Sequence, residues 1–189
     1  MKSIIDENIP LASHIRPGHY NDMDMLEVGR IVGAPQSSFV MENETGLTRR
    51  EEATHFGLWC FLSSPLLIGC DARKIDAETR QLVTNPFLLA MNQNDLGAEA
   101  KTILRKGETY ILVKDCETIG GPSRFLALYN GGEADHEFAV EFYALDLAGQ
   151  VAVFELGERA DLGVFTHEVR MSVPPHGARF FRLDAERRR

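Results

Sequence analysis

The chain has 189 residues, of which 44% are hydrophobic and 25% charged, as in an ordinary soluble globular protein. Its net charge of −8 argues against a nucleic-acid partner, because phosphate contacts need a basic surface. No apolar run reaches the roughly 20 residues of a membrane helix, and the first residues lack the long apolar core of a signal peptide. We therefore expect neither a membrane partner nor a leader in this chain, and the sequence leaves the compartment open.

Residues 1–97 have the pattern of a mixed strand and helix region. Residues 19–26, HYNDMDML, are a candidate strand, and the Gly-, Ser- and Asn-rich residues 27–46 predict a loop. A helix is predicted to start at Thr48, because Thr48 and Glu51 have the spacing of a capping box. Apolar and small residues then recur at helical spacing and predict one buried face, made of Ala53, Phe56, Trp59, Cys60 and Ser63.

Pro65 ends this helix, and a second strand and two short helices are predicted after it. Residues 66–69, LLIG, form a continuous apolar run, which is typical of a parallel strand buried on both faces. Asp76 is a candidate cap for a helix over residues 77–84, and Pro86 a candidate start for a helix over residues 87–94. This order indicates an α/β arrangement, although two strands are too few to close a sheet or a barrel.

From about residue 100 the periodicity changes to that of short strands. Runs near period two alternate with Gly, Asp, Asn and Pro turns, and no helical pattern intervenes. About seven such strands predict an antiparallel β-sandwich. We place a domain boundary near Gly97, which gives domains 1–97 and 98–189. The predicted strands cover residues 102–106, 109–115, 124–130, 136–144, 150–156, 167–173 and 178–183.

Asp22 and Asp24 are the first candidates for catalysis. Glycoside hydrolysis uses two carboxyl groups, and residues i and i+2 of a strand share one face at roughly 6.5 to 7 Å. The chemistry, however, needs carboxyls on opposite sides of the scissile bond, so we expect that these two aspartates are not the catalytic pair. The alternative is structural, with Asn21 and Asp22 bonding nearby backbone N–H groups at the end of the strand.

Other candidate sites have structural alternatives. None of the six histidines forms an H-x-x-x-H pair, and the three cysteines lack zinc-site spacing, so we predict no metal site and no disulfide framework. His55 is interpreted as a hydrogen-bonded packing residue inside its helix. Asp71 follows the second strand, where it either lines a pocket or, as we favour, forms a cap or a salt bridge.

The segment PGHYNDMDMLEVG, residues 17–29, resembles the GGWNDPDMLEVG segment of glycoside hydrolase family 27, the α-galactosidases and α-N-acetylgalactosaminidases. The likeness continues through residues 47–97, which contain THFGLWC followed by SSPLLIGCD. VPPHG, residues 173–177, is similar to the VPAHG of bacterial members. The resemblance implies the last two strand-helix units of a (β/α)₈ barrel, strands seven and eight, followed by an antiparallel β-sandwich domain.

The resemblance also implies which residues touch a sugar. Asp24 and Met25 match family positions in contact with the bound sugar, where a carboxylate accepts bonds from hydroxyls and a thioether packs on the ring. Tyr20 stands where most members have Trp, and Asp22 matches a position that holds the strand end. Met23 replaces the usual Pro, so the resemblance implies a less rigid turn here.

The family's nucleophile and acid/base are aspartates after strands four and six, and neither segment is present in this chain. The resemblance therefore implies the C-terminal part of a retaining glycosidase that needs no cofactor, with no catalytic residue of its own. The implied partner is a carbohydrate with terminal α-linked galactose. A close relative of galactose, such as N-acetylgalactosamine or β-L-arabinopyranose, is the alternative terminal sugar. The alternative is a non-catalytic carbohydrate-binding or assembly module. Exposed barrel strands also lead us to expect either self-association through residues 18–70 or docking of the β domain over that surface.

Overall fold

The computed structural model describes residues 1–29, 46–116 and 122–185. Most of the loop predicted over residues 27–46 lies outside this part. The N-terminal region is helical, and none of the helices described here is long and apolar enough to cross a membrane. Its elements are α1 (Lys2–Asn8), the 3₁₀ turn η1 (Pro10–His14), α2 (Arg49–Phe61), α3 (Ala77–Val83) and α4 (Pro86–Asn92).

Eight strands follow, and all of their pairings are antiparallel. Six form one sheet in the order β1-β2-β3-β8-β5-β6, and β4 and β7 form a second sheet. The seven predicted runs each contain a strand. The additional strand is β6, which has a left-handed Gly163 in a run without clear alternation. The strands are β1 (Ala100–Lys106), β2 (Thr109–Cys116), β3 (Ser123–Asn130), β4 (His136–Glu141), β5 (Val151–Glu155), β6 (Ala160–Phe165), β7 (Glu168–Val173) and β8 (Gly177–Ala185).

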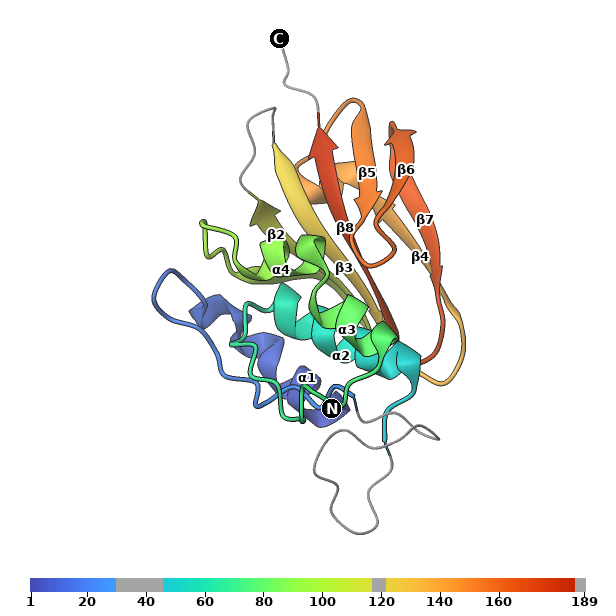
Figure 1. The fold of residues 1–189 in the computed structure, drawn as a ribbon. Coiled ribbons are helices and arrows are strands. Elements are labelled where there is room, and N and C mark those ends of the chain that lie inside the picture. The colour runs from blue at the N-terminus through green and yellow to red at the C-terminus, as the bar shows by residue number, and fades with distance from the viewer. Residues whose placement is uncertain (30–45, 117–121, 186–189) are drawn as a thin grey trace.

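The central strands of the six-stranded sheet are buried on both faces, so the molecule has three layers (Figure 1). On one face, Tyr110, Phe125 and Phe180 join the side chains of α2 and α4 in one apolar cluster. On the other face, Leu126 and Phe181 join the two-stranded β4–β7 sheet in a second cluster. The sandwich prediction is confirmed, together with a helical layer on its outer face. The division into domains at residue 97 stays a prediction, because the first cluster contains residues from both sides of it.

α2 is the central element of the helical layer. Its capping box is present as predicted, with Thr48 Oγ1 accepting from Glu51 N and Glu51 Oε2 accepting from Thr48 N. The predicted single buried face is wrong, because the helix is enclosed on all sides from Thr54 to Phe61 while Ala53 is exposed. The sheet covers one side of the helix and the N-terminal segments cover the other. A Cβ on Gly57 would stand 2.1 Å from the Phe180 ring, so helix and sheet are in direct contact there.

Lys114 of β2 links the sheet to the ends of two helices. Its ammonium group is buried and donates to the carbonyl oxygens of Phe61 (3.2 Å) and Met91 (3.1 Å) and to Ser63 Oγ (2.7 Å). A cation suits the carbonyl groups at helix C-termini. Burial nevertheless lowers the pKa of Lys114 to about 8, because its bonding partners are neutral.

The segments predicted as barrel strands seven and eight meet in one parallel bridge. Leu26 N donates to Leu67 O (2.7 Å), and Gly69 N donates to Leu26 O (2.9 Å). The parallel direction agrees with adjacent barrel strands. The prediction that residues 66–69 are buried on both faces is wrong, since Leu67 is 61% and Ile68 43% exposed.

Candidate functional site

Asp24 lies where the first strand segment turns sharply. Its φ of 73° is in the left-handed region, which aspartate tolerates better than most residues. Asp22 Oδ1 accepts from Asp24 N (3.0 Å), and Asp24 Oδ1 accepts from Met25 N (2.7 Å). These two bonds stabilise the turn locally. The strand geometry assumed for the pair from sequence therefore does not apply, because the backbone is not extended at Asp24.

A stripe of three polar side chains on α2 holds the backbone that follows this turn. Trp59 Nε1 donates to the carbonyl of Asp24 (2.8 Å), His55 Nε2 accepts from Glu27 N (3.0 Å), and Glu52 Oε1 accepts from Gly29 N (2.6 Å). Positions 52, 55 and 59 share one side of a helix. The stripe therefore runs alongside residues 24–29 and bonds their backbone where strand bonds are few.

Ser64 adds a fourth anchor from the residues that follow α2. Its hydroxyl accepts from Met23 N (3.0 Å), and the Met23 side chain is buried. The Trp59 ring is fully buried and meets the His55 ring edge-on, with centroids 4.0 Å apart. The segment that carries Asp24 is thus fixed from behind, while the Asp24 side chain faces outward.

His55 is buried but only partly bonded. Its Nδ1 is the one buried side-chain nitrogen or oxygen without a hydrogen-bond partner in the described part of the chain. The interpretation of His55 as a fully bonded packing residue is therefore wrong. Burial lowers its pKa to about 4, so the ring is neutral at neutral pH. A neutral ring keeps Nε2 available as the acceptor for Glu27 N.

The candidate sugar-contacting residues lie on the outer side of this segment. Tyr20 is 49% and Met25 52% exposed, and Asp22 and Asp24 are also exposed. A Cβ on Gly69 would stand 2.5 Å from Met25 Sδ, so the Met25 side chain lies directly over the second strand segment. We call the exposed residues Tyr20, Asp22, Asp24, Met25, Leu67 and Ile68 together the mouth surface.

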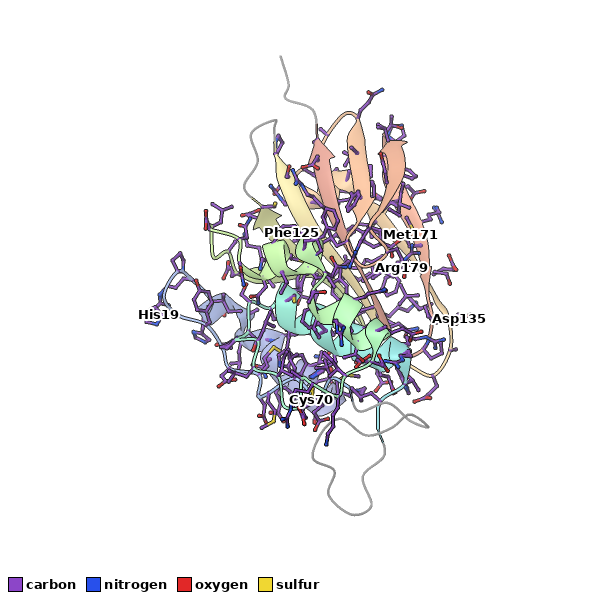
Figure 2. All side chains as sticks on the ribbon, viewed as in Figure 1. His19, Cys70, Phe125, Asp135, Met171 and Arg179 are labelled. Atoms are coloured by element: carbon purple, nitrogen blue, oxygen red, sulfur yellow. The ribbon has the colours of Figure 1, made fainter. Side chains whose placement is uncertain are left out.

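Asp71 lies just beyond the second strand segment and forms salt bridges. Its Oδ1 accepts from Arg73 Nε (2.9 Å) and Arg73 N (3.1 Å), and Lys74 Nζ lies 3.8 Å from Oδ2. The bonds from Arg73 lower the pKa of Asp71. The favoured interpretation of Asp71 as a salt-bridge residue is confirmed. Figure 2 shows the neighbouring Cys70 at the base of the molecule and His19 at its outer edge.

Comparison with known proteins identifies the family. Residues 4–94 match the family model described as "Alpha galactosidase A". "Alpha-galactosidase 2" of Arabidopsis thaliana is 31% identical over 97% of this chain and 42% of its own length. "Alpha-galactosidase A" of Cellvibrio japonicus is 30% identical over 95% of this chain and 43% of its own. The chain belongs to glycoside hydrolase family 27.

Solved structures agree with this assignment. A family-27 β-L-arabinopyranosidase from Geobacillus stearothermophilus, in complex with arabinose, superposes with a TM-score of 0.83 at 25% identity. The matched region covers 98% of this chain and 42% of the arabinopyranosidase chain. The α-galactosidase I of Mortierella vinacea, at 23% identity, has the same fold with a TM-score of 0.79 over 97% of this chain and 44% of its own. The family-27 chain thus spans less than half the length of these relatives and corresponds to their C-terminal portion.

Sequence reasoning identified the exposed residues of this family-27 segment but missed the stripe behind them. Glu52, His55 and Trp59 have helical spacing, which is the signal that was available. The expected buried face of α2 included Trp59 but left out Glu52 and His55, because it was drawn from apolar and small residues. The role of the stripe depends on the distant segment 24–29, which sequence spacing alone does not place beside α2.

Proposed function

We propose that this chain forms part of the sugar-binding rim of a retaining α-galactosidase-type glycoside hydrolase. The observation that carries the proposal is the exposed Asp24–Met25 pair on a backbone that Trp59 holds from behind. Asp24 accepts hydrogen bonds from hydroxyls of the sugar, and Met25 and Tyr20 pack against its apolar face. Asp22 holds the turn through its bond to Asp24 N.

The reaction itself belongs to carboxylates outside this chain. A retaining mechanism places a nucleophile and an acid/base about 5 to 5.5 Å apart on opposite sides of the glycosidic bond. Asp22 and Asp24 are neighbours on one tight turn, and the Asp22 carboxylate is engaged by the backbone of Asp24. Neither aspartate stands across a pocket from the other, which supports a binding role and no catalytic role for both.

The substrate class is a terminal α-linked galactose or a related sugar of similar shape. The relatives named as α-galactosidases and the β-L-arabinopyranosidase with bound arabinose support this range. Galactopyranose and arabinopyranose share the ring hydroxyl pattern and differ in the exocyclic carbon. An acceptor at Asp24 and an apolar contact at Met25 suit the ring that both sugars have.

The test joins this chain to the preceding part of Arabidopsis α-galactosidase 2 and measures hydrolysis of an aryl α-galactoside. We expect the isolated chain to be inactive and the fusion to be active. Asp24→Asn should lower kcat/KM at least tenfold, since a hydrogen bond to a charged group contributes about 1.5 to 3 kcal/mol. Asp71→Asn is the matched control and should retain activity. Turnover by the isolated chain that Asp24→Asn or Asp22→Asn abolishes would contradict the assignment.

A self-associating, non-catalytic module is the second candidate, and the mouth surface is the observation that favours it. Tyr20, Met25, Leu67 and Ile68 are each more than 40% exposed, and together they give an apolar area suited to a partner. Sedimentation velocity on the isolated chain separates the two candidates. A dimer that Leu67→Glu dissociates supports self-association, and a monomer at all concentrations contradicts it.

A further inference from the structure

Two connections, from β4 to β5 and from β6 to β7, meet at one end of the sandwich. Glu141 at the end of β4 pairs with Glu168 at the start of β7, and Val151 of β5 pairs with Phe165 at the end of β6. Figure 1 shows that β6 and β7 meet at the end of the sandwich away from α1. The turn η2 (Phe142–Leu145), the following loop and the β6–β7 turn enclose a hollow of about 780 Å³ there. This volume is within the range of ligand sites.

Tyr143 presents an exposed aromatic face at this hollow. Its side chain is 76% exposed, although its neighbours Phe142 and Leu145 are each only 2% exposed and anchor η2 in the core. Phe142 N donates to the carbonyl of His167 (2.9 Å), which ties η2 to the β6–β7 turn. Interaction with the Glu141 carboxylate raises the pKa of Tyr143. The exposed ring therefore sits on a rigid base.

The polar groups around the ring offer both donors and acceptors. Arg170 Nε donates to Glu168 Oε1 (2.8 Å), and Gln150 and Thr166 also line the hollow. Two carboxylates, Glu141 and Glu168, face one guanidinium group, so the charged side chains carry a net −1. An anionic ligand is disfavoured by this balance, and a small apolar ligand would leave these polar groups unpaired.

We propose that this hollow is a second carbohydrate site, which binds a neutral saccharide stacked on Tyr143. A pyranose ring has an apolar C–H face that can stack on an exposed aromatic ring. Its hydroxyl groups can form hydrogen bonds with the carboxylates of Glu141 and Glu168 and with the amide of Gln150. The apolar body and polar tip of tyrosine serve both needs. The site is separate from the mouth surface and does not depend on the hydrolytic role of the chain. It would hold a polymeric glycan without cleaving it.

The test is native gel electrophoresis of the full chain in gels containing soluble galactomannan, with anionic polygalacturonate as the charged comparison. We expect galactomannan to retard the wild type, with polygalacturonate giving weaker retardation. Tyr143→Ala should weaken binding at least tenfold without changing the thermal midpoint, because the side chain is exposed. Tyr143→Trp should retain binding, since it keeps an aromatic face. Asp71→Asn should leave the retardation unchanged, because Asp71 lies outside the hollow and is paired with Arg73.

Amide NMR titration with a galactomannan oligosaccharide locates the contact directly. Shifts at Gly149, Thr166 and Glu168 would support the site. Absence of retardation by galactomannan, or retardation that Asp24→Asn removes and Tyr143→Ala does not, would overturn it. Stronger retardation by polygalacturonate than by galactomannan would also overturn it, because the ligand would then be an anion.

Discussion

The strand segments near the N-terminus and the strands after residue 99 differ in how their backbones are held. In the sandwich, each strand is paired through an antiparallel ladder, with register shifts in the β1–β2 and β5–β6 ladders, and the central strands have partners on both sides. The segments around Leu26 and Ile68 share one parallel bridge, and side chains from α2 bond the adjoining backbone. The comparison shows that side chains on a helix can form hydrogen bonds with the backbone of a segment that has few strand partners.

The largest predicted effect breaks the contact between the two regions. Gly57→Ala would place a methyl group within the Phe180 ring, and overpacking of this kind costs about 1 to 3 kcal/mol, with the upper end expected here. Urea unfolding measures the loss of stability. Gly157→Ala, where no atom lies within 4 Å of the added Cβ, is the matched control. Adding Phe180→Leu to Gly57→Ala should restore part of the stability, and an equally stable Gly57→Ala single variant would contradict the contact.

The second prediction concerns acid and the α2 stripe. The folded-state pKa of His55 is about 4 and its ordinary value is 6.5, so the unfolded chain binds the proton more readily between these values. Stability should fall by about 3 kcal/mol as the pH drops from 6.5 to 4, and this contribution is constant above that window.

His55→Gln isolates this effect, because an amide oxygen still accepts from Glu27 N and does not titrate. The difference in unfolding free energy between wild type and variant should change across pH 4 to 6.5 and be flat above it. Amide exchange at Glu27 should quicken in acid before exchange in the sandwich does. A parallel decline in both proteins would contradict the role of His55.

The smallest prediction concerns His176, at the joint between the two regions. Its Nδ1 lies 3.2 Å from Glu51 Oε1 on α2, and its Nε2 lies 3.1 Å from Glu133 Oε1 beyond β3. The hydrogen bond to Glu133 is the main cause that raises the pKa of His176. Its contribution is therefore complete below pH 6.5 and is lost as the pH rises through the folded-state pKa, opposite in sign to His55.

The side chain of His176 is 40% exposed, so the effect on stability should be small. NMR titration of the histidine rings is the sensitive measurement, with the midpoint of His176 above 6.5 and that of His55 below it. Glu133→Gln should lower the midpoint of His176 and leave that of His55 unchanged. If Glu133→Gln leaves the midpoint of His176 unchanged, the ion pair between His176 and Glu133 is contradicted.

Local signals in the sequence predicted most of the fold. The capping box at Thr48, the caps at Asp76 and before Pro86, and the strand runs of the sandwich depend on neighbouring residues. The exposure of Leu67 and Ile68 was not predictable in this way, because an apolar run does not state whether another layer covers it. The same applies to β6, whose short run becomes a strand through pairing with β5.

The sequence predicted the exposed residues of the candidate site. It did not predict the α2 side chains that hold their backbone. Tyr20, Asp22, Asp24 and Met25 came from the family resemblance, and their contact with sugar stays a prediction. The left-handed turn at Asp24 was not foreseen, because a D-x-D pattern in a strand suggests an extended backbone. Its position depends on Trp59, which lies 35 residues further along the chain.

The hydrogen bonds from the stripe on α2 to Asp24, Glu27 and Gly29 go to main-chain atoms. Main-chain atoms are the same whichever amino acid occupies a position, so this anchoring is indifferent to the outward side chains. Under the proposed role of Met25, a substitution there would change the contact offered to a sugar and leave the scaffold beneath intact. Recognition and mechanical support are then tasks of different atoms in one short segment.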